Sequence, residues 1–211
     1  MPGRTMDSQI TRSPRRRSTA PRKGDLREQA ILDTAEGLLA VPGYDAMTMA
    51  DIAAGTGITR GALYFYFGSK QEVVTALVAR TVRALHDKSR AAGDDPDAPR
   101  AAIETAMRRT ANIWLEHGLV MRAAIDLSPV IPAVGDLWSE TADIFIRAIS
   151  VILERAGIPP GPHPGQVGAM AAPVCWMIER SFYHASRVSP DELQRTSATC
   201  QDLWLRIAGL V

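Results

Sequence analysis

The sequence predicts an all-α protein of about nine helices, and two observations lead to this fold class. Apolar residues recur at helical spacing in one segment after another, and the gaps between these segments contain proline, glycine or both. No stretch alternates in the way that a strand would. The aromatic residues 65–67 favour a strand on propensity, but they lie within a helical frame that can override it. The absence of a fixed-period repeat argues against a solenoid.

The individual helices follow from their end signals. A first helix is expected at 25–40, where a Pro-Gly pair stops it. Thr48 and Thr59 are suitable N-caps for two short helices, and Ser69, three residues before Glu72, starts a fourth that ends before the break at residue 93. The further helices are expected at about 98–117, 119–127, 132–156, 164–187 and 190–208.

Composition excludes several classes of protein. The chain has 211 residues, of which 46% are apolar and 22% charged, which is enough for a proper core and excludes a mostly disordered chain. Two cysteines, Cys175 and Cys200, cannot staple a chain of this length, so a reducing compartment, the cytoplasm, is expected. The longest apolar run, 167–178, is interrupted by Pro173 and is shorter than the roughly 20 residues that cross a bilayer. No membrane partner and no secretory signal are expected.

The net charge of +1 hides an uneven distribution. Residues 1–23 hold seven basic residues against one acidic residue and are rich in Pro, Ser and Thr, so we expect a disordered basic arm. The first 90 residues contain 14 basic and 9 acidic residues, whereas the remainder contains 10 and 14. This asymmetry favours a nucleic-acid-facing end joined to a part with another task, although an incidental tail is the alternative.

Residues 48–70, TMADIAAGTGITRGALYFYFGSK, predict a helix-turn-helix. Such a unit needs an apolar face that two short helices share, a small residue where they cross and a turn residue that tolerates positive φ. Ile52, Ala53 and Gly57 supply these three features. The other apolar residues that face the same core are Ile58 and Leu63. An ordinary pair of core helices is the alternative interpretation.

The second helix of such a unit reads bases in the major groove from its N-terminal part. Arg60 can present two donors to guanine, and Gly61 lets the backbone approach the DNA. Thr48 and Thr59 offer hydroxyl groups and free backbone N–H groups to phosphates, unless they are plain caps. Tyr64 and Tyr66 add phenolic donors, and Lys70 adds a charge, with a half-buried Tyr66 and a solvated Lys70 as the alternatives.

These residues resemble the DNA-binding region of the TetR family of transcriptional regulators. The matching positions are Ile52-Ala53, Gly57-Ile58-Thr59, Gly61, Leu63-Tyr64, Tyr66-Phe67 and Ser69-Lys70. The family usually has Ala-Gly in the turn, whereas this chain has Thr56-Gly57. Within the family, the basic arm and residues 63–70, 137–139 and 179–182 resemble the branch of the mycobacterial ethionamide-resistance regulators.

The resemblance implies a homodimer, joined through the last two helices of each subunit, on a pseudo-palindromic operator in double-stranded DNA. It also implies a C-terminal domain that binds a small molecule and releases the DNA. The DNA contacts that it implies are Thr48, Thr59, Arg60, Gly61, Tyr64, Tyr66 and Lys70. Arg15, Arg16 and Arg17 have no fixed register in the family, and only electrostatics favours their contact with phosphates or the minor groove. The expected domains are the arm at 1–23, the helix-turn-helix domain at 24–69 and the effector-binding and dimerisation domain at 70–211.

The C-terminal half has the composition of a sensor. Pro173 lies in a nearly all-apolar helix and tends to kink it, which can frame a cavity among aromatic residues. Glu179 and Tyr183, one helical turn apart, could supply the few polar groups of such a site. The candidate ligand-binding residues are Met107, Trp114, Trp138, Phe145, Trp176, Glu179 and Tyr183. An ordinary packed core, with Glu179 paired to an arginine, is the alternative.

The sequence therefore favours a DNA-binding regulator, in particular a repressor that a small lipophilic effector releases from its operator. A DNA-binding or scaffolding protein whose C-terminal half only dimerises is the alternative. An enzyme would need clustered ionisable groups, and the four histidines are scattered without a ligand spacing. No catalytic motif, metal site or cofactor is predicted.

Overall fold

The computed structural model describes the backbone of residues 23–93 and 98–211 and the side chains of 23–86 and 98–211. These residues form eight helices and no strand, which confirms the all-α fold class. The helices are α1 (Lys23–Ala40), α2 (Met49–Thr56), α3 (Arg60–Tyr66), α4 (Lys70–Gly93), α5 (Pro99–Leu127), α6 (Pro132–Arg155), α7 (Val167–Ala185) and α8 (Pro190–Ile207).

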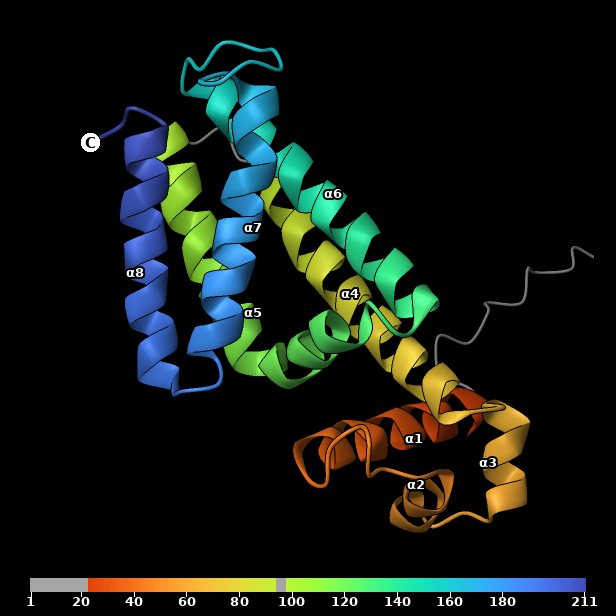
Figure 1. Ribbon diagram of the computed structural model, residues 1–211. Helices are drawn as coiled ribbons and strands as arrows, with labels where there is room; N and C mark the ends of the chain where they lie inside the picture. Colours follow the sequence, from red (N-terminus) through yellow and green to blue (C-terminus); the bar gives the residue numbers. More distant parts are fainter. Residues whose placement is uncertain (1–22, 94–97) are drawn as a thin grey trace, which may run out of the picture.

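The count is eight because two expected helices are one. The sequence predicted a break at Gly118, but α5 runs through it as a bent helix (Figure 1). Gly118 is buried, and a Cβ atom there would lie 3.7 Å from Cβ of Ser186, beyond the end of α7. Glycine weakens an isolated helix by about 1 kcal/mol, but tertiary packing on both sides overrides that preference.

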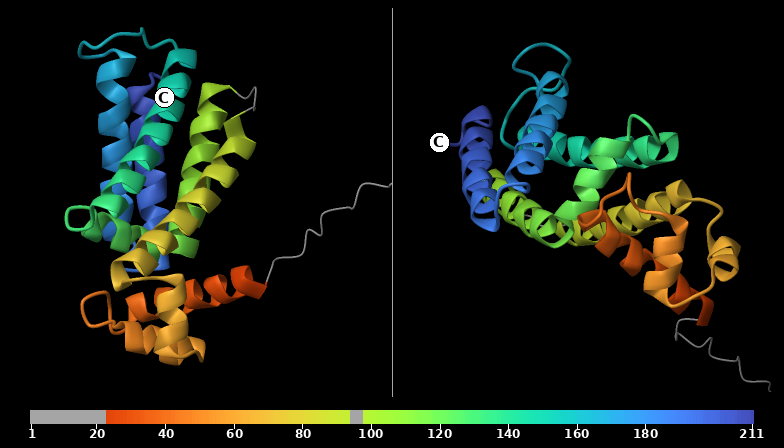
Figure 2. Two further views of the ribbon diagram at one scale, coloured as in Figure 1. Left: turned by 90° about the vertical axis from the view of Figure 1, so that its right-hand side faces the viewer. Right: turned by 60° about the horizontal axis from the view of Figure 1, so that its bottom comes forward.

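The chain is arranged as two parts that α4 connects. In Figures 1 and 2, α1, α2 and α3 form a compact unit at one end, and α5 to α8 form a bundle at the other. Helix α4 begins beside α3 and extends along the bundle, where it packs against α5 and α6. A movement of the bundle can therefore reach the small unit through α4.

Two clusters of buried apolar side chains stabilise these parts. The N-terminal cluster joins α1 to α3 with the first half of α4, around Ile31, Ile52 and Leu63, and it also includes Val120 from α5. The C-terminal cluster lies among α5 to α8 and includes Leu85 from α4. The half-buried Trp138 of α6 packs against both clusters, so it lies where the two parts meet.

Polar contacts also fasten α4 to α1. The guanidinium group of Arg80 lies 2.5 Å from Oδ1 of Asp33 and 2.7 Å from Oε2 of Glu36, both on α1. Its side chain is largely shielded from solvent, which makes these pairs stronger than fully exposed ones.

None of the helices described here is, taken singly, long and apolar enough to cross a membrane. The bent pair of α5 and α6 meets the length and composition requirement only as a pair.

Candidate DNA interface and effector cavity

Helices α2 and α3 have the geometry of a helix-turn-helix. Thr48 caps α2 in a capping box: its hydroxyl oxygen accepts from the backbone N–H of Asp51 at 3.2 Å, and its own N–H donates to Asp51 Oδ2 at 2.9 Å. The Asp51 carboxylate accepts from the Thr48 hydroxyl group at 2.7 Å and from the Thr48 backbone N–H, and these two bonds lower the pKa of Asp51. At the other end of α2, Gly57 has φ of 68°, in the left-handed region that glycine adopts without strain. The turn glycine expected from the sequence is therefore in place.

The turn also explains the departure from the usual Ala-Gly pair. Oγ1 of Thr56 lies within hydrogen-bond distance of two acceptors, the backbone carbonyl oxygen of Ile52 at 2.7 Å and Oγ1 of Thr34 on α1 at 3.1 Å. Next to it, a Cβ atom at Gly55 would lie 2.6 Å from the methyl carbon of Thr34. Helix α2 thus crosses α1 closely, and Thr56 supplies a polar tie at the crossing.

The N-terminal part of α3 is open to solvent. Thr59 caps the helix by accepting from the N–H of Ala62 at 3.1 Å, and Arg60 and Gly61 are exposed. Arg60 forms no ion pair with the part of the chain that the structure describes. A Cβ atom at Gly61 would meet only the Thr59 hydroxyl oxygen, at 4.0 Å. Tyr64, one turn further, is 47% exposed.

Two of the residues expected at the DNA have contacts within the chain. Tyr66 is half-buried and packs against the N-terminal cluster. Lys70 donates from Nζ to the backbone carbonyls of Tyr44 at 2.9 Å and Asp45 at 3.3 Å, and Nζ lies 4.3 Å from the centre of the Tyr44 ring. Lys70 therefore ties the start of α4 to the loop after α1, instead of being a free surface charge.

Phe65 was missed by the sequence reasoning, which treated it only as strand-prone. Its side chain is 86% exposed, whereas Leu63 and Phe67 on either side are buried. The exposure of Phe65 could have been predicted from its position, because residues two apart lie on roughly opposite sides of a helix and Leu63 faces the core. The arm with Arg15, Arg16 and Arg17 lies outside the described residues, except that Lys23 begins α1.

A cavity of about 340 Å³ lies within the bundle. Helices α4 to α8 all contribute to its wall, which is mostly apolar and aromatic. Four of the expected ligand residues, Trp114, Trp138, Phe145 and Glu179, line it. Lining residues that the sequence reasoning did not select include Arg109, Thr141, Cys175 and Trp204.

The polar end of the cavity is built around Glu179. Its Oε2 accepts from Nε1 of Trp138 at 2.9 Å. Burial raises the pKa of the Glu179 carboxyl group, although the Trp138 bond and the charge of Arg180 oppose that shift. Burial and the neighbouring Glu179 raise the pKa of the Cys175 thiol to about 11, so this thiol stays neutral and weakly reactive.

Comparisons with known proteins agree with this geometry. The model of the tetR family of bacterial regulatory proteins matches residues 31–77, from the middle of α1 to the first turns of α4. Over 203 residues the chain is 30% identical to the HTH-type transcriptional regulator EthR of Mycolicibacterium smegmatis, and the match covers 92% of each chain. The chain belongs to the TetR family.

Further relatives agree with this assignment. The EthR of Mycobacterium tuberculosis is 34% identical over 146 residues, which cover 67% of this chain and 66% of EthR. Among solved structures, a transcriptional regulator from Saccharomonospora viridis in complex with choline has a TM-score of 0.72 at 17% identity, covering 86% of this chain and 96% of that one. This structural likeness supports the shared fold alone. TetR regulators bind operator DNA, dimerise and bind small ligands.

Three of the ligand residues expected from the sequence do not line the cavity of this TetR-family chain. Met107 is fully buried in the C-terminal cluster. Trp176 lies on the outer side of α7 and is 44% exposed. Tyr183 is buried, and its hydroxyl group donates to Asp126 Oδ1 on α5 at 2.6 Å. The Tyr183 hydroxyl group is therefore bonded to α5. Glu179 lines the cavity and Tyr183 does not, although the two residues are one helical turn apart.

Trp204 lines the cavity together with Trp114 and Trp138, whereas Trp176 does not. Trp204 lies on α8 and is 3% exposed. Its Nε1 atom has no hydrogen-bond partner among the described residues. Within those residues, no group of three or more His, Cys, Asp or Glu side chains could hold a metal ion.

Proposed function

We propose that this TetR-family regulator is a homodimeric repressor and that a small lipophilic effector, bound in the cavity, releases it from its operator. The cavity is the observation that carries the proposal. A bundle that served only for dimerisation needs no such space, and protein interiors normally fill theirs. The mostly apolar wall with a few polar groups is typical of a ligand site.

For DNA binding, the exposed start of α3 is the recognition surface, and Arg60 offers its guanidinium group to guanine. Thr48, Thr59 and Tyr64 are placed for phosphate contacts, and the bare backbone at Gly61 allows close approach. Phe65 adds an apolar side chain for a thymine methyl group. Tyr66 and Lys70 act mainly by shaping this surface. The arm with Arg15 to Arg17 adds positive charge for contacts with phosphates. A protein that acts on chromosomal DNA in bacteria works in the cytoplasm, which is the proposed location.

Coupling between the cavity and the DNA runs through α4 and Trp138. Leu85 of α4 lines the cavity, while Arg80, five residues earlier, holds α1 through Asp33 and Glu36. Trp138 lines the same cavity and contacts the N-terminal cluster. An effector that displaces α4 changes the spacing of the two recognition helices, which must match half-sites about 34 Å apart.

The dimer interface of the proposal is the outer face of α7 and α8. The two helices pack side by side (Figure 1), and their outer faces present Trp176 and Leu203, each at least 40% exposed. A tryptophan with that exposure is typical of an interface. The proposed units are the basic arm, the helix-turn-helix unit with the start of α4, and the bundle.

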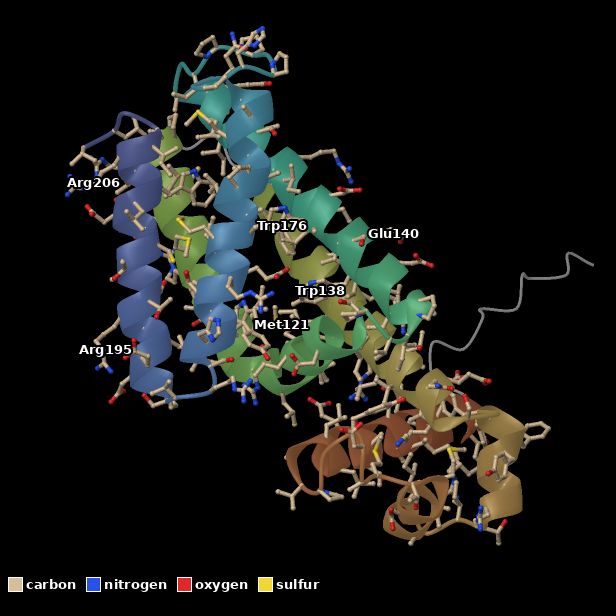
Figure 3. The ribbon with its side chains drawn as sticks, in the orientation of Figure 1. Met121, Trp138, Glu140, Trp176, Arg195 and Arg206 are labelled. Carbon is tan, nitrogen blue, oxygen red and sulfur yellow. The ribbon has the colours of Figure 1, made fainter. Side chains whose placement is uncertain are left out.

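A gel-shift titration on DNA from the gene's own promoter region tests the proposal. We expect binding that weakens steeply between low and moderate salt, and that weakens by about 1 to 3 kcal/mol in Arg60→Ala. Arg195→Ala is the matched control, because Arg195 points outward from α8, remote from α3 (Figure 3). Equal loss in both variants would contradict the assigned surface. Added decanol should release the DNA if the cavity controls binding.

A further inference from the structure

Glu179 brings a carboxylate into a cavity whose wall is mostly apolar and aromatic. Only Oε2 has a hydrogen bond to another side chain, the one from Trp138, and no ion pair to Glu179 occurs within the described part of the chain. The nearest arginine in sequence, Arg180, is exposed, and its guanidinium carbon lies 5.1 Å from the ring centre of Tyr183. Arg180 therefore moderates the charge without pairing with it.

A buried carboxylate is unfavourable unless a partner compensates its charge. The raised pKa of Glu179 has burial as its main cause, so the protein itself supplies only part of that compensation. Four aromatic residues line the same cavity: Trp114, Trp138, Phe145 and Trp204. Aromatic faces attract cations, and they do so more strongly where water is excluded.

Two arginines also line the cavity and would favour an anion. Arg155 ends α6, 17 residues after Trp138, which is about 26 Å along a helix, so it lies far from Glu179. Arg109 is half-buried, and its long side chain can keep the charged group in water. Glu179 is short and fixed by its bond to Trp138. The cavity wall thus contains a carboxylate that its hydrogen bond to Trp138 holds in place.

We propose that the effector is an apolar molecule carrying a positively charged ammonium group, which pairs with the Glu179 carboxylate beside the aromatic rings of Trp138, Trp114 and Phe145. This inference rests on the proposed function, because it takes the cavity to be the effector site. It narrows a lipophilic effector to a cationic amphiphile and makes Glu179 the residue that selects it.

Binding of three ten-carbon probes to the full-length protein tests the inference. Decyltrimethylammonium, decanol and decanoate are titrated below their micelle concentrations by isothermal calorimetry. We expect the cation to bind about tenfold tighter than decanol, the effect of a single compensated charge. In Glu179→Gln that preference disappears while decanol affinity is unchanged, which also shows that the cavity is intact. Glu140→Gln is the control, because Glu140 points away from the bundle (Figure 3).

Several results would overturn the inference. Tightest binding of decanoate would assign the cavity to anions at Arg109. A cation preference that survives in Glu179→Gln, or that Glu140→Gln also abolishes, would remove Glu179 from the selection.

Gel shifts with the same probes separate this inference from the proposed function. If the cation binds through Glu179 but does not release DNA, the charge inference holds and effector control fails. If decanol or decanoate releases DNA while the cation has no advantage, effector control holds and the charge inference fails.

Discussion

Gly61 is a glycine that the fold itself does not need. Its φ is not positive, and a Cβ atom there would have ample space. This differs from Gly57, where the left-handed conformation requires glycine, and from Gly55, where Thr34 leaves no room. The proposed approach of the α3 backbone to DNA would account for a glycine at this position.

Gly61→Ala should accordingly separate stability from DNA binding. Alanine is a better helix former, so the variant should be as stable as the parent or more stable by about 0.5 to 1 kcal/mol. Its DNA affinity should fall by about 1 to 3 kcal/mol, because a methyl group displaces the backbone from the groove. Gly37→Ala in α1, also exposed and with open space, should gain stability without losing affinity. Urea unfolding and gel shifts measure both, and an unchanged affinity for Gly61→Ala would rule out a close approach of the α3 backbone to DNA.

Glu179 is a second residue whose proposed role in binding comes at a cost to stability. Glutamine keeps the shape and the acceptor for Trp138 but has no charge. Burial makes the pKa of Glu179 higher in the folded state than in the unfolded state, so protonation of this carboxyl group stabilises the fold. This stabilisation is fully present below the unfolded-state pKa of about 4.3 and is lost as pH rises through the folded-state pKa. Glu179→Gln should therefore have the higher melting temperature at pH 7, and the difference should shrink toward pH 4. A lower melting temperature than the parent at pH 7 would indicate a compensated charge.

At the scale of elements, the sequence predicted best what is decided locally. The caps at Thr48 and Thr59 and the turn at Gly57 depend on a few neighbouring residues, so α2 and α3 could be predicted closely. The continuity of α5 could not, because Gly118 is a local breaker whose helix is maintained by packing on distant residues. Helical spacing could not place Trp176 or Tyr183 either, since both lie on apolar helix faces and only the neighbouring helices decide which face meets the cavity.

Arg80 is the residue by which α4 holds α1, and its removal tests the link. Arg80→Gln removes the ion pairs with Asp33 and Glu36, which should lower the free energy of unfolding by about 1 kcal/mol. DNA affinity should fall as well, and decanol should release the remaining complex less effectively. Arg83→Gln, at an exposed position of the same helix, serves as the control. Full effector response in Arg80→Gln, measured by gel shift, would show that the link runs elsewhere.

At the scale of the whole molecule, Trp176 connects the monomer to the proposed dimer. An indole of 44% exposure on the outer face of α7 is best explained by a partner that covers it. Trp176→Glu should place a charge in the interface and give a monomer in sedimentation velocity at micromolar concentration. Val188→Glu, also at an exposed apolar position but in the turn before α8, should remain dimeric. A dimeric Trp176→Glu variant would move the interface away from this face.

The uneven charge along the chain predicts that the N-terminal arm contributes to DNA affinity and not to dimerisation. Residues 1–22 carry six of the arginines, and Lys23 begins α1, so deletion of 1–22 removes none of the residues that the structure describes. For every phosphate that the arm neutralises, its deletion should flatten the slope of log affinity against log salt by about 0.9. We expect weaker DNA binding with a flatter salt dependence and an unchanged dimer, because α7 and α8 lie in the bundle. Gel shifts at several salt concentrations and sedimentation measure the two properties. If the deletion leaves the salt slope unaltered, α3 and its neighbours supply all of the phosphate contacts.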